Sequence, residues 1–147
     1  MTTNNINLYN NFIELTRNKE LYKYLEGQDI FSDRMMIFLI HFAFYLKVRK
    51  TKYNKEILQK SYDFMFRQLE LSIREIGYGD QTINKKMKDY INIFHSILSD
   101  IHFWNELNFD QKNEKLKIYL DKFNDLKHLV RYFDQFHIDL TKNKLNL

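Results

Sequence analysis

The sequence predicts an all-α protein: a single compact domain, residues 1–147, of about six to seven helices built round a central apolar helix and an antiparallel helical hairpin. Three observations support this prediction. Apolar residues recur at steps of three and four along most of the chain, which is the spacing of a buried helical stripe. The chain has no proline and only three glycines, whereas an all-β fold needs many more turn residues. A length of 147 residues without a linker-like segment is typical of one domain.

The first two expected elements are short. A helix is expected over residues 6–17, followed by a second helical segment over residues 19–26 that ends at Gly27, with a bend or break near residues 18–20. The first residues have no apolar core behind a basic start and no Arg-rich amphipathic pattern. We therefore expect neither a secretory signal nor a transit peptide.

Residues 29–49 form the most apolar stretch and predict the central helix, capped by Asp29 or Ser32. Residues 35–46 (MMIFLIHFAFYL) contain no charged side chain. At ~1.5 Å per residue they extend ~18 Å, which is short of the ~30 Å hydrocarbon core of a bilayer. We therefore expect a helix buried nearly all round. The functional alternative is that part of it floors an apolar groove for a client helix.

His41 lies inside this apolar run. We expect a hydrogen-bonded core histidine, with Asp33, Asp63 or a backbone carbonyl as its partner, rather than a metal ligand or a catalytic base.

The run KVRKTKYNK, residues 47–55, contains five basic residues and is expected to form a loop after the central helix. One interpretation is a solvated turn whose charges complement the helix dipole, and the other is a contact for an anionic partner.

Two long apolar stripes, residues 58–76 and 83–101, predict the hairpin. The first helix is expected to end at Gly77, because a left-handed terminating residue is least strained without a Cβ. About five residues join the two helices, and Asp80 or Thr82 is expected to cap the second.

The last part of the chain predicts two further helices, one that starts at Asp110 and one over residues 125–140, separated near Asn124. Trp104, the single tryptophan, is expected to fill the core or, as the less favoured alternative, to anchor a surface. The tail from residue 141 is expected to be frayed.

Side chains suited to catalysis are scarce. The chain has no cysteine, no glycine-rich phosphate loop and no convincing nucleophile–base pair, so no enzyme activity and no cofactor are expected. Two Asp-x-x-His pairs, Asp125/His128 and Asp134/His137, are faintly similar to the Glu-x-x-His pairs of di-iron bundles. Because both pairs lie in one segment, surface histidines are the favoured interpretation over a metal site.

The net charge of +4 and the pI of about 9.1 permit an anionic partner such as RNA, the ribosome or lipid headgroups. The joint abundance of Asn, Ile and Lys is also what an AT-rich genome produces, which weakens this evidence. Specific DNA binding is not expected.

Residues 74–80 form the string Arg-Glu-x-Gly-x-Gly-Asp, and a lysine follows six residues further on. With this specific string, the middle of the chain, residues 31–97, resembles the ubiquinol-cytochrome c chaperone family. Gln68 departs from the family pattern, which has an acidic residue there, and Asp33 replaces a glycine before Arg34. The matching residues are Arg34, His41, Asp63, Met65, Phe66, Ile73, Arg74, Glu75, Gly77, Gly79, Asp80, Ile83, Lys86, Lys88 and Phe94.

This resemblance implies a non-enzymatic assembly chaperone for the cytochrome bc1 complex (respiratory complex III) that binds newly made cytochrome b. It implies a small helical co-chaperone, contact with the ribosome or an anionic membrane surface, and, for a bacterial-type chain, a cytoplasmic location peripheral to the inner membrane. The expected partner-binding residues are Arg34, His41, Asp63, Phe66, Arg74, Glu75, Gly77, Gly79, Asp80, Lys86 and Lys88. The alternative, from charge alone, is a small basic helical RNA- or ribosome-binding protein without a cytochrome client.

Overall fold

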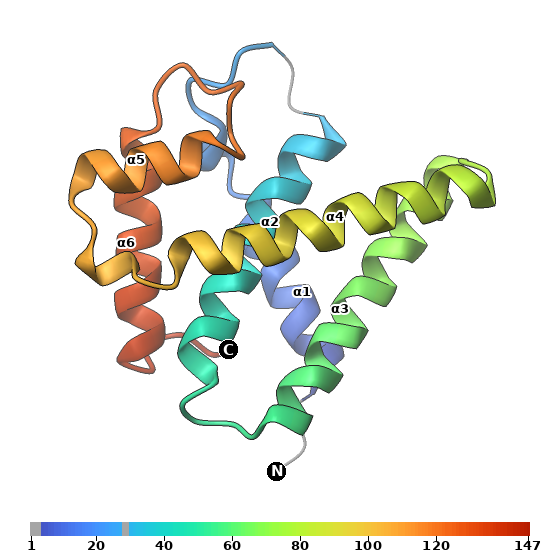
Figure 1. Cartoon of the computed structure of the whole chain (residues 1–147), viewed down its shortest axis with the longest axis horizontal. Coiled ribbons are helices and arrows are strands. Elements are labelled where there is room, and N and C mark those ends of the chain that lie inside the picture. Colours follow the sequence, from blue (N-terminus) through green and yellow to red (C-terminus); the bar gives the residue numbers. More distant parts are fainter. Residues whose placement is uncertain (1–3, 28–29) are drawn as a thin grey trace.

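The computed structural model describes residues 4–27 and 30–147, and it confirms the all-α prediction (Figure 1). The described residues form six α-helices that share one hydrophobic core. Within this part of the chain, extended pairing is limited to a single bridge between Leu25 and Phe123. The helices are α1 (Asn5–Thr16), α2 (Phe31–Arg49), α3 (Lys55–Ile76), α4 (Asp80–Ile101), α5 (Phe109–Lys117) and α6 (Lys127–Thr141).

The central helix α2 is buried nearly all round, as predicted, because α1, α4 and α6 pack against it on different sides. Residues 35–46 contain no charged side chain, so the helix has no polar face to expose to solvent. At its start the backbone N–H of Ile30 donates to Asp33 Oδ2 at 3.2 Å. Ser32 lies inside the helix, so its predicted role as the cap is wrong, and Asp29 lies outside the described residues. In the parts of the chain described, every helix falls short of the length and apolar content that crossing a membrane requires.

The predicted hairpin consists of α3 and α4, and Gly77 ends α3 as expected. Its φ of +103° lies in the left-handed region, where a residue with a Cβ is strained. Only residues 77–79 join the two helices, fewer than the five expected. Gly79 occupies the cap position of α4 without a side-chain hydrogen bond, so the predicted caps Asp80 and Thr82 are wrong. The two helices meet at this corner and diverge away from it (Figure 1).

The second predicted N-terminal helix is wrong in most of its length. Residues 19–22 form one 3-10 turn, after which Tyr24 adopts a positive φ of 63°. The chain then runs beside residues 122–124, where the Glu26 N–H donates to the Lys122 carbonyl at 2.8 Å. Gly27 has a positive φ but ends no helix.

The C-terminal part follows the prediction with two corrections: α5 ends earlier than the expected separation near Asn124, and the tail is ordered. Helix α5 is capped by Asn108 and ends at Lys117, while α6 and the burial of Trp104 are as expected. The tail is not frayed, because the buried guanidinium of Arg49 donates to the carbonyls of Leu140 (3.3 Å) and Leu147 (2.9 Å). A buried cation needs such acceptors, and these contacts hold the tail against the end of α2.

Candidate functional site

The glycine corner between α3 and α4, with the first turns of α4, holds seven of the residues expected to bind a partner. Across this corner, Nη1 of Arg74 donates to Oδ1 of Asp80 at 2.7 Å. The first and last residues of the Arg-Glu-x-Gly-x-Gly-Asp string therefore form an ion pair with each other. This hydrogen bond raises the pKa of Arg74. The Lys86 ammonium lies 4.8 Å from the centre of the Tyr78 ring, over its face. Glu75, Gly77, Gly79 and Lys88 are exposed.

The structure does not bring the other four expected residues to this corner. Arg34 lies near the start of α2, with its guanidinium 5.8 Å from the centre of the Tyr22 ring. Asp63 is exposed on α3 and accepts a hydrogen bond from Gln59. Phe66 is buried and packs edge-on against Phe94 of α4. These three residues therefore lie at separate places in the fold and do not form one surface with the glycine corner.

His41 is a fully buried core residue of α2, as predicted, and a backbone carbonyl is one of its partners. Its Nδ1 lies 2.8 Å from the Ile37 carbonyl oxygen, which can only accept, so Nδ1 carries a hydrogen. Its Nε2 lies 2.6 Å from the Tyr132 hydroxyl of α6. Burial lowers the pKa of His41 to about 4, against the smaller opposing effect of the Ile37 bond. His41 is therefore neutral at physiological pH.

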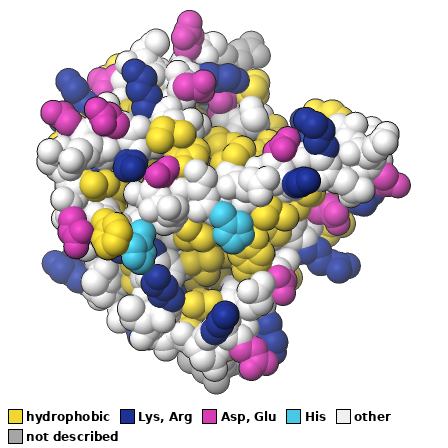
Figure 2. All heavy atoms as spheres, in the orientation of Figure 1, with side chains coloured by type: hydrophobic (Ala, Val, Ile, Leu, Met, Phe, Trp, Pro, Cys, Tyr) yellow, Lys and Arg dark blue, Asp and Glu magenta, His cyan; other side chains and the backbone are white. Residues whose placement is uncertain are grey.

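A groove of about 860 Å³ opens where α3 and α4 diverge, on the face shown in Figure 2. Figure 2 shows hydrophobic surface exposed between the two helices, with histidines at its edge. We call this feature the α3–α4 groove. Its walls are the first half of α3 and the last half of α4, and the end of α2 with the connection to α3 completes it. It is lined by Leu46, Lys47, Lys50, Tyr53, Lys55, Leu58, Gln59, Tyr62, His95, Leu98, Ser99, His102 and Phe103.

The α3–α4 groove has an apolar floor. Leu46, Leu58 and Leu98 come from three different helices and are each only partly buried. Phe103 lies beside the groove with 59% of its surface exposed, which makes it one of the most exposed large apolar side chains described. Such aliphatic and aromatic surface is suited to a partner's apolar side chains.

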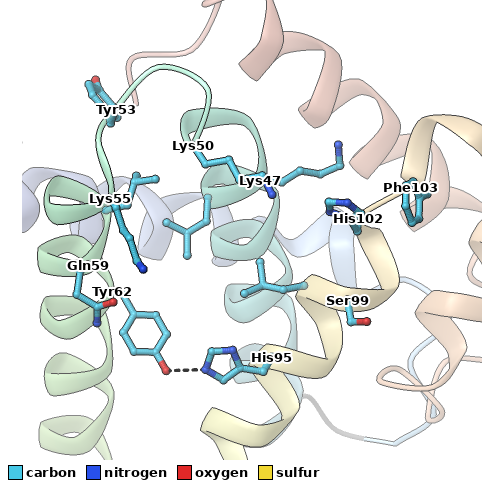
Figure 3. A pocket seen from close by; sticks show the side chains of 13 residues that line it. Lys47, Lys50, Tyr53, Lys55, Gln59, Tyr62, His95, Ser99, His102 and Phe103 are labelled. Atoms are coloured by element: carbon cyan, nitrogen blue, oxygen red, sulfur yellow. Dashed lines mark hydrogen bonds between the residues drawn. The ribbon is translucent and has the colours of Figure 1, made fainter.

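A hydrogen bond between Tyr62 and His95 connects the two walls. The Tyr62 hydroxyl and His95 Nε2 lie 3.1 Å apart, as the dashed line in Figure 3 marks. The ring centres are 5.8 Å apart, and Tyr62 also packs on Phe66 and Phe94. The contacts of Tyr62 and Phe66 with Phe94 thus hold α3 and α4 together next to the hydrogen bond between Tyr62 and His95.

Three lysines surround the groove and no carboxylate lines it among the described residues. Lys47 and Lys50 come from the end of α2, and Lys55 begins α3. Figure 3 shows Lys47 beside His102 and Lys55 on the α3 side of the groove. Burial, followed by the charge of Lys50, lowers the pKa of Lys47. The site therefore concentrates positive charge at the edge of an apolar surface.

The sequence predicted part of this site. The basic run 47–55 does lie at the groove, but only residues 50–54 form its loop, because Lys47 and Arg49 belong to α2 and Lys55 to α3. Arg49 faces the core, so it is unsuited to an anionic partner.

Sequence reasoning missed the roles of Tyr62, Leu98 and Phe103. Tyr62 and Leu98 lie on stripes that a helical pattern assigns to the core, and nothing in the spacing indicates that α3 and α4 separate there. The one available signal was a pair of histidines, His95 and His102, one on the second stripe's helix and one directly after it.

The two Asp-x-x-His pairs do not form a metal site in the described residues, where no group of three potential ligands occurs. Asp134 accepts hydrogen bonds from Trp104 Nε1 (2.8 Å) and from Lys112 Nζ (2.9 Å). His137 is buried, so the expectation of a surface histidine is wrong at that position.

Comparison with known families gives one match. A family model described as Ubiquinol-cytochrome C chaperone matches residues 23–102, which is more than half of the 147-residue chain. The matched segment includes α2, α3 and α4, and with them the glycine corner and nearly all of the groove lining. No curated protein and no solved structure matches the chain.

Proposed function

Because the chain belongs to the ubiquinol-cytochrome c chaperone family, we propose that it assists complex III assembly by binding newly made cytochrome b, without catalysis. The observation that carries the proposal is this membership together with the α3–α4 groove, which lies within the matched segment. We further propose that the protein works at the surface of the inner membrane, on the cytoplasmic side.

The apolar groove supports a holding function. A newly made membrane protein exposes apolar helical surface before it is assembled, and such surface is stabilised by burial against leucine and aromatic side chains. Leu58, Leu98 and Phe103 supply that kind of contact without unfolding any part of the chaperone.

A deletion strain tests the proposal. Loss of the gene is expected to destabilise cytochrome b and deplete complex III while the other respiratory complexes stay normal. Complementation with Phe103→Ser should restore less complex III than the wild type. Complementation with Phe109→Ser is the matched control, because Phe109 is an exposed phenylalanine on α5 outside the groove. Normal complex III in the deletion strain would refute the proposal.

Site-specific crosslinking tests the identity of the client. The chain has no cysteine, so one introduced thiol is unique. Ser99→Cys places a thiol in the groove, whereas Asn124→Cys places one on an exposed position between α5 and α6, outside the groove lining and the glycine corner. Cytochrome b should be captured from membranes by the first variant and not by the second. Equal capture by both would place the client elsewhere.

A second candidate is binding to RNA or the ribosome without a cytochrome client, which the lysines at the groove and the pI of about 9.1 favour. It predicts affinity for RNA that falls steeply as salt is raised. Filter binding over a salt series decides it, and affinity that is absent or insensitive to salt would exclude it. The same assay applied to ribosomes tests the ribosome contact that the family resemblance implies.

A further inference from the structure

We propose that the α3–α4 groove binds an amphipathic helix of a partner protein whose apolar face is bordered by aspartate or glutamate side chains. The inference rests on the proposed function, since it specifies the chemistry of the segment that the same groove accepts. It is argued from the shape, the floor and the charges of the groove.

The shape of the groove fits a helix. Its walls are two diverging helices and its floor is the end of a third, which leaves an open trough rather than a closed cavity. A volume of about 860 Å³ corresponds to the seated half of roughly four turns of a helix, taken as a cylinder ~10 Å wide with a pitch of 5.4 Å. A short helix can therefore seat one face there and keep its other face in water.

The floor selects apolar side chains on the seated face. Leu46, Leu58 and Leu98 converge from α2, α3 and α4, so leucine-like residues at i, i+3 and i+4 of the partner would meet them. Phe103, at 59% exposure, adds an aromatic side chain that a partner can cover.

The lysines of the groove favour acidic side chains on either side of the partner helix's apolar face. In the described structure Lys47, Lys50 and Lys55 form no ion pair, and none of the residues that line the groove is acidic. Elsewhere, partly buried Lys112 is paired with Asp134 at 2.9 Å. The charge of Glu106 already acts on Lys47. Lys50 and Lys55 are thus left to an external carboxylate, which a partner helix supplies beside its apolar stripe or at its negative C-terminal end.

RNA and a lipid surface fit the same groove less well. Among the described residues that line the groove there is no arginine, the side chain that best forms forked contacts with phosphate and stacks on bases. Its aromatic Tyr62 is engaged by His95, which reduces its availability for stacking. A lipid surface is flat, whereas the leucines here lie in a trough between two helices.

Two labelled peptides test the inference against the full chain by fluorescence anisotropy. The first is a designed amphipathic helix with leucines at i, i+3, i+4 and i+7 and glutamates along both flanks. The second has the same leucines and lysines in place of the glutamates. We expect the glutamate peptide to bind about tenfold more tightly or better, since several exposed charge pairs add their small contributions. Equal binding of the two peptides, or stronger competition by single-stranded RNA or anionic vesicles, would overturn the inference.

Charge-changed variants assign the binding to the groove. Lys47→Gln/Lys50→Gln/Lys55→Gln should abolish most of the preference for glutamate. The matched control, Lys117→Gln/Lys127→Gln/Lys142→Gln, removes three exposed lysines outside the groove and should retain it. Lys50→Glu/Lys55→Glu should reverse the preference toward the lysine peptide, which a misfolded variant would not do. An unchanged preference in both groove variants would also overturn the inference.

Failure of this inference is distinguishable from failure of the proposed function. If deletion of the gene depletes complex III while the groove variants bind the two peptides as the wild type does, the chaperone function stands and the groove assignment falls. If the peptide preference holds while complex III stays normal in the deletion strain, the groove chemistry stands with a different client.

Discussion

His41 of α2 and Tyr132 of α6 are hydrogen-bonded at 2.6 Å through Nε2 and the phenolic hydroxyl, although 91 positions separate them in the sequence. Three aromatic rings of α6, those of Tyr132, Phe133 and Phe136, also pack edge-on around the imidazole. Burial raises the pKa of Tyr132, so the phenol stays protonated and can donate to Nε2. The pair connects the family-matched segment to a helix outside it.

The first prediction concerns acid stability. In the folded state the pKa of His41 is lowered to about 4, from the ordinary value of 6.5, so between these values the unfolded chain binds more protons than the folded one. Stability is therefore expected to fall as the pH drops from about 6.5 to about 4, by up to roughly 3 kcal/mol. Urea unfolding over this range measures it. The free energy of unfolding of the His41→Asn variant should change less with pH over this range.

His137 provides the control for this experiment. Burial also lowers the pKa of His137, with a further contribution from Lys47, so His137 changes stability in the same direction. His137→Asn should leave most of the pH dependence in place. If His137→Asn and not His41→Asn flattens the curve, the assignment to His41 is wrong.

The second prediction concerns the glycine corner. Gly77 has a φ of +103°, and a Cβ added to it would meet no heavy atom within 4 Å beyond its chain neighbours, so a side chain there is strained by the backbone alone. Gly77→Ala is expected to reduce the free energy of unfolding by about 1–2 kcal/mol. Gly79→Ser is the matched control, because Gly79 has an ordinary φ of −73° at the cap of α4, where serine is favourable. Equal loss of stability in the two variants, measured by urea unfolding, would contradict the corner geometry.

The third prediction concerns the salt bridge at the same corner. Arg74 and Asp80 keep 44% and 82% of their side-chain surfaces exposed, so water and salt screen their interaction. Arg74→Ala and Asp80→Ala should each change the melting temperature little, and a double-mutant cycle should show coupling that disappears at high salt. A large loss of stability in either single variant would assign the pair a structural role instead of a role in partner binding.

The fourth prediction concerns Trp104, whose fully buried indole N–H donates to Asp134. Asp134→Ala leaves this donor without its acceptor, which is expected to lower stability by roughly 1–3 kcal/mol. Asp134→Asn retains an amide oxygen and should lose less. Unfolding followed by circular dichroism compares the two variants, and an equal loss in both would show that the ion pair between Asp134 and Lys112 dominates at this site.

The periodic apolar residues were sufficient to predict the helical core. In α3 the residues Met65, Phe66, Leu69 and Ile73 are all buried, as the three-and-four spacing indicates. Gly77 also ended its helix as predicted, because the strain of a left-handed residue is a local property. Helix burial and helix termination were predicted correctly here because both depend on residues that are close together in the sequence.

The parts that failed depend on distant contacts. Residues 23–26 have a helical composition but do not form a helix, because residues 24–26 pair with residues 122–124 through backbone hydrogen bonds. The tail is ordered by Arg49, which lies more than 90 positions away from its acceptors in the sequence. The groove likewise results from the angle between α3 and α4, and no single helical pattern contains that angle.

The position of α6 over α2 has a consequence for how the chain is made. Translation proceeds at roughly 5–20 residues per second, so the 91 positions between His41 and Tyr132 correspond to a delay of about 5–20 s. During that delay the most apolar helix has left the translating machinery but lacks the helix that covers one of its sides. The nascent chain is thus vulnerable to aggregation until α6 is made.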